Sequence, residues 1–205
     1  MADTLLTGTT LVEKESRSVG DIPVGGIVEW DDTFSAIPEN FRECNGETVN
    51  DPSSPYVGTA VPDLNTNYWT TTGLAFVGSG TSGDGVDGWN YEENIYGTMH
   101  INDSITVAVS VNLPHGAVVT SCIVEGDAGS EDTSWTLLRR QKASTTETEM
   151  ATANIGTADT SIYSATIDNA TYSYFIKTGT LANHDDIFGT TIIYTPRFKF
   201  IIRIK

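Results

Sequence analysis

The 205-residue chain is long enough for one or two domains, each with a hydrophobic core. Its 27 acidic and 11 basic residues give a formal net charge of −16. A chain of this charge repels phosphate, which excludes the usual nucleic-acid-binding surface and disfavours anionic membranes. No apolar run reaches the roughly 18 residues of a membrane-spanning helix, so we expect no membrane insertion.

Residues 1–19 are polar and weakly patterned, and they lack the basic start and the long apolar stretch of a signal peptide. We predict an extended N-terminal arm, ordered only where a neighbouring subunit or domain holds it. We also expect the protein to be made in the cytoplasm and to leave by a route such as cell lysis.

The apolar pattern along the chain predicts strands rather than helices. No window offers apolar residues at helical spacing for three turns. β-Branched and aromatic residues come in short runs separated by Gly, Pro, Asn and Asp, which is typical of an antiparallel protein with many strands. The predicted fold class is therefore all-β.

Three short blocks follow one another between residues 20 and 65. They comprise Pro23, Gly25, Ile27 and Trp30, then Pro38, Phe41, Cys44, Asn45 and Gly46, then Pro62, Asp63 and Leu64. In this order and at these separations the blocks resemble the phage tail collar domain of tail fibres and related virion proteins. Members of that family often continue with an arginine-containing segment, but residues 67–73 read Asn-Tyr-Trp-Thr-Thr-Thr-Gly. No role of those arginines carries over.

The collar-like part is predicted to be small. Asn45-Gly46 predicts a tight hairpin turn with two positive-φ positions, and Trp30, Phe41 and Leu64 are the expected core. Such a core is marginal in isolation, and burial against neighbouring subunits would stabilise it. Because fibre proteins commonly assemble about a threefold axis, the resemblance implies a homotrimer.

The predicted domain organisation has four parts. They are the arm at 1–19, a collar-like domain at 20–77, a glycine-rich linker at 78–94 and a β-sandwich at 95–205. The end of the chain is similar to the closing strand of collar-type proteins. Residues 197–205 are therefore an alternative completion of the collar-like part, which would make the middle of the chain an insertion.

The pattern of residues 95–205 predicts a two-sheet sandwich or jelly roll. Its strands are predicted at residues 105–111, 118–124, 135–140, 162–167, 172–177 and 190–195, with a turn at 113–117 and a polar loop at 141–149. The alternation over 105–111 predicts one buried and one exposed face. The turn at 113–117 and the strand at 135–140 also resemble small sandwich modules attached to bacterial and viral surface proteins.

Aromatic residues gather around the glycine-rich segment. They are Tyr68, Trp69, Trp89, Tyr91 and Tyr96. Exposed rings in this cluster could stack on sugar faces, which makes these five residues the candidate surface-binding site. The alternative is that the two tryptophans pack between the two parts of the chain as interdomain core.

The histidines, the acidic residues and the motif content of the sequence do not indicate an enzyme or a cofactor or metal site. The sequence lacks serine-elbow, zinc-protease and phosphate-loop motifs. His100 could meet its copies on a threefold axis, and residues 184–186 or the pair Asp84 and Asp87 offer oxygen ligands for calcium. Polar turns in which Asp supports its own backbone are the simpler interpretation of both acidic segments. We expect no enzyme, no cofactor and no metal.

The two cysteines, Cys44 and Cys122, do not make a disulfide framework in a chain of this length. We predict two free thiols that behave as small buried apolar groups.

These features favour a structural protein of a virus particle, namely a tail-fibre or collar-type component of a tailed phage that contributes to host attachment. Its expected location is the virion, and its expected partners are its own copies, other virion proteins and a host glycan or protein. The alternatives are a capsid or tail decoration protein and a carbohydrate-binding module.

Overall fold

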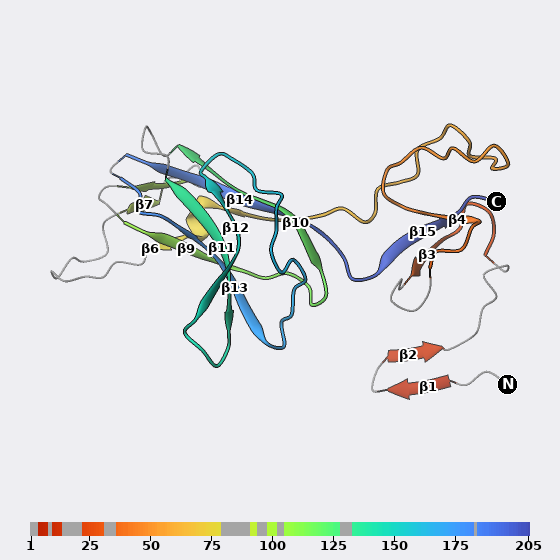
Figure 1. Ribbon diagram of the computed structural model, residues 1–205, viewed down its shortest axis with the longest axis horizontal. Helices are drawn as coiled ribbons and strands as arrows, with labels where there is room; N and C mark the ends of the chain where they lie inside the picture. Colours follow the sequence, from red (N-terminus) through yellow and green to blue (C-terminus); the bar gives the residue numbers. More distant parts are fainter. Residues whose placement is uncertain are drawn as a thin grey trace. The chain divides into compact units, whose positions relative to one another are not determined.

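The computed structural model divides the chain into two compact units (Figure 1). Unit 1 comprises Met1–Leu64 with Phe198–Lys205, and unit 2 comprises Asn65–Arg197. The structure describes residues 4–7, 10–13, 22–30, 36–78, 91–93, 98–101, 105–127, 133–182 and 184–205, and only the backbone at 4–13, 91–93 and 100. No described helix has the length and apolarity that crossing a membrane requires.

The all-β prediction is confirmed, because the described chain forms antiparallel sheets joined by turns and one short 3-10 helix. The strands of unit 1 are β1 (Thr4–Thr7), β2 (Thr10–Glu13), β3 (Ile27–Trp30), β4 (Phe41–Glu43) and β15 (Lys199–Arg203). The elements of unit 2 are β5 (Asn67–Thr72), η2 (Gly73–Ala75), β6 (Val77–Gly78), β7 (Tyr91–Glu93), β8 (Met99–Ile101), β9 (Val107–Val111), β10 (Val118–Asp127), β11 (Ser134–Gln141), β12 (Glu147–Asn154), β13 (Tyr172–Thr178) and β14 (Asp186–Thr195).

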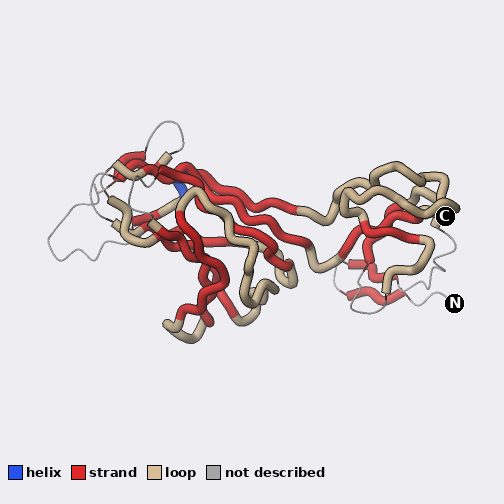
Figure 2. Tube along the Cα trace, turned by 45° about the horizontal axis from the view of Figure 1, so that its top comes forward, coloured by secondary structure: helices blue, strands red, loops and turns tan. Residues whose placement is uncertain are grey.

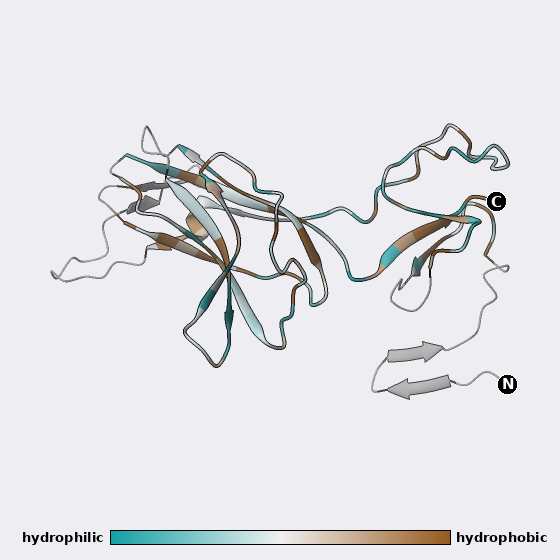
Figure 3. Ribbon diagram, viewed as in Figure 1, coloured by the Kyte–Doolittle hydropathy of each residue, from teal (hydrophilic) through white to brown (hydrophobic). Residues whose placement is uncertain are grey.

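The closing strand β15 is the middle strand of the sheet in unit 1, between β3 and β4. Ile201 pairs with Val28 on one side and with Glu43 on the other. Figure 3 colours β15 brown along most of its length, which marks it as apolar. Ile201 is fully buried, and Ile204 packs with Val49 and Val61 in a small cluster. The two ends of the chain's collar-like sequence therefore fold together.

The predicted core of the collar-like part is right at one position and wrong at another. Phe41 is fully buried and Trp30 is half-buried, but Leu64 is 40% exposed. The core residues that were not predicted lie in the loop 44–64 and in the final strand, where no alternation marks them.

The Asn-Gly prediction also needs correction. Gly46 has a φ of +80°, but Asn45 is not among the described residues with positive φ, so this is not a turn with two left-handed positions. Instead the Asn45 side-chain oxygen accepts a hydrogen bond from the Glu47 amide at 3.2 Å. Asn45 bridges to Asp63 and Thr48 to Ala60, which closes a long loop, drawn in tan in Figure 2.

The arm at 1–19 is described only in part. The backbone of β1 and β2 forms a two-stranded antiparallel hairpin instead of a single extended segment. The remaining residues of the arm lie outside the described chain.

Unit 2 is built from two five-stranded sheets. One has the order β12-β11-β13-β9-β6, and the other has the order β10-β14-β8-β7 with β5 also paired to β14. Alternation gives β9 one apolar face, on which Val107, Val109 and Val111 are buried. Trp135 lies fully buried in the core, and its indole nitrogen donates to the Thr157 carbonyl at 3.1 Å.

Two features of unit 2 differ from the prediction, and a third agrees with it. The polar loop at 141–149 is shorter, because β12 begins at Glu147 and has Met150 as its single large apolar residue. The segment 162–167 is not a strand but an irregular stretch that bridges to β10 through Thr166 and Val118. The turn at 113–117 does form, since the Ala117 amide donates to the Pro114 carbonyl at 3.1 Å.

The domain boundary lies earlier than the predicted one after residue 77. It falls between Leu64 and Asn65, because β5 pairs with β14 over six residues. The predicted linker 78–94 lies mostly outside the described residues, and its described part includes β7 in a sheet of unit 2.

Candidate functional site

An incompletely paired strand edge marks a concave described surface of unit 2. Strand β13 pairs with β9 from Ala108 to Val111, whereas β6 covers only Val107 and Ala108 on the other side. If β6 extended toward the N-terminus, the residues before Val77 would pair with the rest of β9. Instead these residues include η2 and lead to β5 in the other sheet. Among the described residues, the β9 edge beyond Ala108 therefore has no paired strand.

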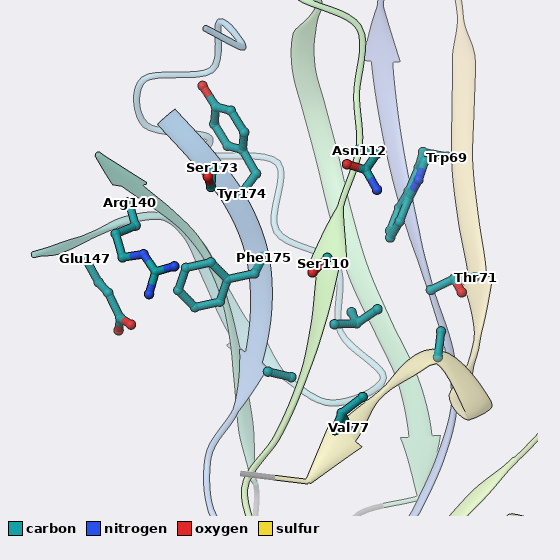
Figure 4. Close-up of a pocket in the computed structure, with 13 residues that line it drawn as sticks. Trp69, Thr71, Val77, Ser110, Asn112, Arg140, Glu147, Ser173, Tyr174 and Phe175 are labelled. Carbon is teal, nitrogen blue, oxygen red and sulfur yellow. The ribbon is translucent and has the colours of Figure 1, made fainter. Parts of the chain in front are cut away.

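A groove of about 640 Å³ lies along this edge, and we call it the β9 groove. It is lined by Trp69, Thr71, Ala75, Val77, Ala108, Val109, Ser110, Asn112, Arg140, Glu147, Ser173, Tyr174 and Phe175. Figure 4 shows the Trp69 ring beside the Asn112 amide, although the two come from different sheets. This end of the groove thus combines an aromatic face with an amide and nearby hydroxyls.

The other end of the groove carries charge. The Arg140 guanidinium lies over the Phe175 ring, 5.8 Å from its centroid, and Glu147 is the cross-strand partner of Arg140. Figure 4 shows these three side chains together on the side of β13 away from Trp69. A cation, a carboxylate and an aromatic ring on one face can contact a polar ligand that has its own apolar surface.

The groove continues into a hollow of about 350 Å³ toward Lys142 and Asn169. There the Lys142 amine donates to the Asn169 carbonyl at 2.7 Å. Burial raises the pKa of Tyr174. Its hydroxyl oxygen therefore stays protonated and accepts a hydrogen bond from the Asp168 amide at 2.6 Å. These two hydrogen bonds tie the segment 168–169 to Lys142 and to strand β13 at this part of the wall.

The structure separates the predicted aromatic cluster. Tyr68 and Trp69 are neighbours in β5 and therefore point to opposite faces of the sheet. Tyr68 is 64% exposed, whereas Trp69 packs against the core of unit 2 and reaches the β9 groove with its remaining surface. Tyr91 lies on β7, of which only the backbone is described, and Trp89 and Tyr96 lie outside the described residues.

Sequence reasoning missed the residues that form most of the groove. Ser110, Asn112 and Ser173 are small polar residues on strands and carry no distinctive local pattern. Only the register of β9 against β13 brings them together. The alternation of β9 predicted which residues face outward, but it did not predict that one edge would lack a partner.

The candidate calcium and histidine positions show no ligand cluster. No group of three metal-ligating side chains occurs in the described part of the chain. The Asp185 carboxylate accepts a hydrogen bond from the Ala182 amide at 2.8 Å, so it supports its own turn as the simpler interpretation predicted. Asp84 and Asp87 lie outside the described residues, and the side chain of His100 is not described.

Another hollow, of about 470 Å³, lies in unit 1, and its lining includes the carboxylates of Glu43, Glu47 and Asp51. Two of its carboxylates are engaged: Glu43 with Lys199 at 3.3 Å, and Asp51 with Lys205 at 2.7 Å. The hydrogen bond from Lys205, with those from Ser53, lowers the pKa of Asp51. These carboxylates hold the C-terminal segment in place.

Both cysteines are buried free thiols, as the sequence predicted. Burial raises the pKa of Cys44, and it raises the pKa of Cys122 to about 12. Neither thiol is therefore a candidate nucleophile near neutral pH.

Comparisons with known proteins show only distant likeness. No family model and no curated protein matches the chain. The C-terminal CBM6 of LamC, a marine laminarinase from Zobellia galactanivorans, aligns with 63% of this chain and 100% of its own, at 12% identity and a TM-score of 0.34. Eiger TNF from S. frugiperda aligns over 69% of this chain and 94% of its own, at 16% identity and a TM-score of 0.18. Both scores are too low to bear on function.

Proposed function

We propose that the chain is a non-enzymatic structural protein of a virus particle, of the tail-fibre or collar type. In this proposal unit 1 is the collar-like part, and the β-sandwich of unit 2 contributes to host attachment. One observation carries this proposal: the three collar-like sequence blocks and the C-terminal strand fold into a single unit, with the sandwich inserted between them.

The first block contacts the C-terminal strand through its backbone. The Gly25 amide donates to the Arg203 carbonyl at 2.8 Å, and the Arg203 amide donates to the Gly26 carbonyl at 3.0 Å. Gly25 has a φ of +86°, and a Cβ there would lie 2.4 Å from the Tyr56 hydroxyl. The glycine of this block is therefore required by both backbone conformation and packing.

The second block joins the same sheet, and the third block is bonded to the second. The Cys44 amide donates to the Phe200 carbonyl at 2.8 Å, and the Leu64 amide donates to the Cys44 carbonyl at 2.9 Å. The buried Ser54 hydroxyl, in the loop between these blocks, donates to the Ile204 carbonyl at 2.6 Å. The residues that carry the resemblance are thus the residues that build unit 1.

The proposed assembly is a homotrimer. The described residues of unit 1 form one three-stranded sheet besides the hairpin, and contact with further copies would stabilise a core this small. Attachment would then combine several weak sites on one particle, which raises avidity without a deep pocket.

Particle fractionation tests the proposal. Tailed particles are purified from a culture that produces this chain and are banded in a density gradient. In each fraction, mass spectrometry quantifies the chain relative to a known capsid protein. The expected result is a constant ratio of the two proteins across the particle band. Recovery of the chain only in the cell fraction would overturn the proposal.

Carbohydrate binding is a second candidate function, and the β9 groove favours it. A ring face at Trp69 beside the Asn112 amide, with Arg140 farther along, provides stacking and hydrogen bonds for a sugar. On a glycan array, Asn112→Ala and Arg140→Ala should each abolish a signal that Tyr163→Ala retains, because Tyr163 is exposed and does not line the groove. Absence of any glycan signal from the unmodified chain would exclude this candidate.

A further inference from the structure

Among the described residues, the outer surface of three neighbouring strands in unit 2 carries no charged side chain over most of its length. We call it the β10-β14-β5 face, formed by Ser121, Ile123, Thr191, Ile193, Tyr68 and Thr70. Register places these residues in two rows across the sheet. Ser121, Ile193 and Tyr68 form one row, and Ile123, Thr191 and Thr70 form the next.

The absence of charge is a property of this face and not of the unit. Glu125 is the next outward residue along β10, and it is the first acidic or basic side chain at that end of the face. The outer surface of the other sheet, in contrast, carries Arg140, Glu147, Glu149 and Lys177 on neighbouring strands. The whole chain has a net charge of −16.

Charge therefore restricts where copies of this chain can meet. Copies of a strongly acidic protein repel one another, and bringing carboxylates together also requires their desolvation. The cores of protein interfaces are depleted in Asp, Glu and Lys and enriched in tyrosine. The β10-β14-β5 face fits this composition, with the Tyr68 ring 64% exposed at its border.

We propose that the β10-β14-β5 face is the surface through which copies of this chain associate. The inference rests on the homotrimer of the proposed function and names the part of the sandwich that meets its copies. An uncharged sheet face of threonine and isoleucine can pack against another sheet surface at the ordinary sheet-to-sheet distance of about 10 Å.

Sedimentation velocity of the full chain, at low salt and in about 1 M salt, tests this surface. The unmodified chain should associate, and association should tighten with salt, because screening weakens the repulsion between acidic copies. The test variant is Thr70→Asp, and the matched control is Thr148→Asp, an exposed threonine of β12 in the other sheet. Both variants add the same charge to an exposed strand position.

Thr70→Asp should weaken association by at least about tenfold, since it places an unpaired charge in the contact. Thr70→Lys should weaken association similarly, although it lowers the net negative charge. Circular dichroism and thermal melting confirm that each variant is folded.

The outcomes separate this surface from the wider proposal. If the chain forms an oligomer and Thr70→Asp and Thr148→Asp weaken it equally, the β10-β14-β5 face is not the association surface. The proposed homotrimer would remain compatible with that result. A chain that is monomeric at both salt concentrations would overturn both the face and the homotrimer, while particle fractionation still decides whether the chain belongs to a virion.

Discussion

Replacing Ile201 with alanine tests whether the C-terminal strand holds unit 1 together. Ile201 is fully buried in the middle strand of the sheet in unit 1 and pairs with both neighbouring strands. Truncating a buried isoleucine to alanine costs about 2–5 kcal/mol. Because unit 1 is small, this loss should lower protection against hydrogen exchange by about 30-fold to a few thousand-fold throughout the unit.

Hydrogen exchange with mass spectrometry resolves the two units. In Ile201→Ala, exchange should accelerate in peptides from 22–64 and 198–205 and remain unchanged in peptides from 105–127. Ile176→Ala is the matched control, because Ile176 is fully buried in β13 of unit 2, and it should produce the opposite pattern. Faster exchange confined to 198–205 would refute the reasoning, because β15 would then be separable from the unit that it is said to complete.

Three further predictions concern single interactions. Burial holds the pKa of Cys122 at about 12, so its thiol should not react with an aromatic disulfide reagent at about pH 8 until the protein is unfolded; rapid labelling of the folded protein would contradict its burial. The pKa of Asp51 is lowered from 3.8, mainly by the hydrogen bond from Lys205; its contribution to stability is therefore present above about pH 4 and is lost as the pH falls further. The urea midpoints of unit 1 in the wild type and in Asp51→Asn should converge as the pH falls from about 5 to 2, and a gap that widens would show that the sign is wrong. Trp135→Phe removes the donor to the Thr157 carbonyl and should destabilise unit 2 by about 1–3 kcal/mol in urea unfolding, whereas an unchanged midpoint would mean that water replaces the indole.

The fold class and several strands could be predicted because alternation is a local property. Val107, Val109 and Val111 face the core as their spacing requires. The position of the domain boundary could not be predicted in this way. It depends on the pairing of β5 with β14, which lie more than a hundred residues apart. Strand β12 was missed for a different reason, because an edge strand with one polar face carries few apolar residues.

The candidate site was harder to predict than the fold. Sequence proximity brought Tyr68 and Trp69 together as one aromatic cluster, but adjacent strand residues point to opposite faces. The structure consequently assigns them to different surfaces: Trp69 to the β9 groove and Tyr68 to the β10-β14-β5 face. Both surfaces include short polar residues that come together only through strand register, a property that a single sequence does not show.

The location of the chain in a particle is the most direct test of its proposed role. Gold-labelled antibody raised against the full chain is applied to purified tailed particles and viewed by electron microscopy. Label concentrated on the tail or its fibres is the predicted result. Label spread over the capsid would indicate a decoration protein instead, and unlabelled particles would contradict a virion role altogether.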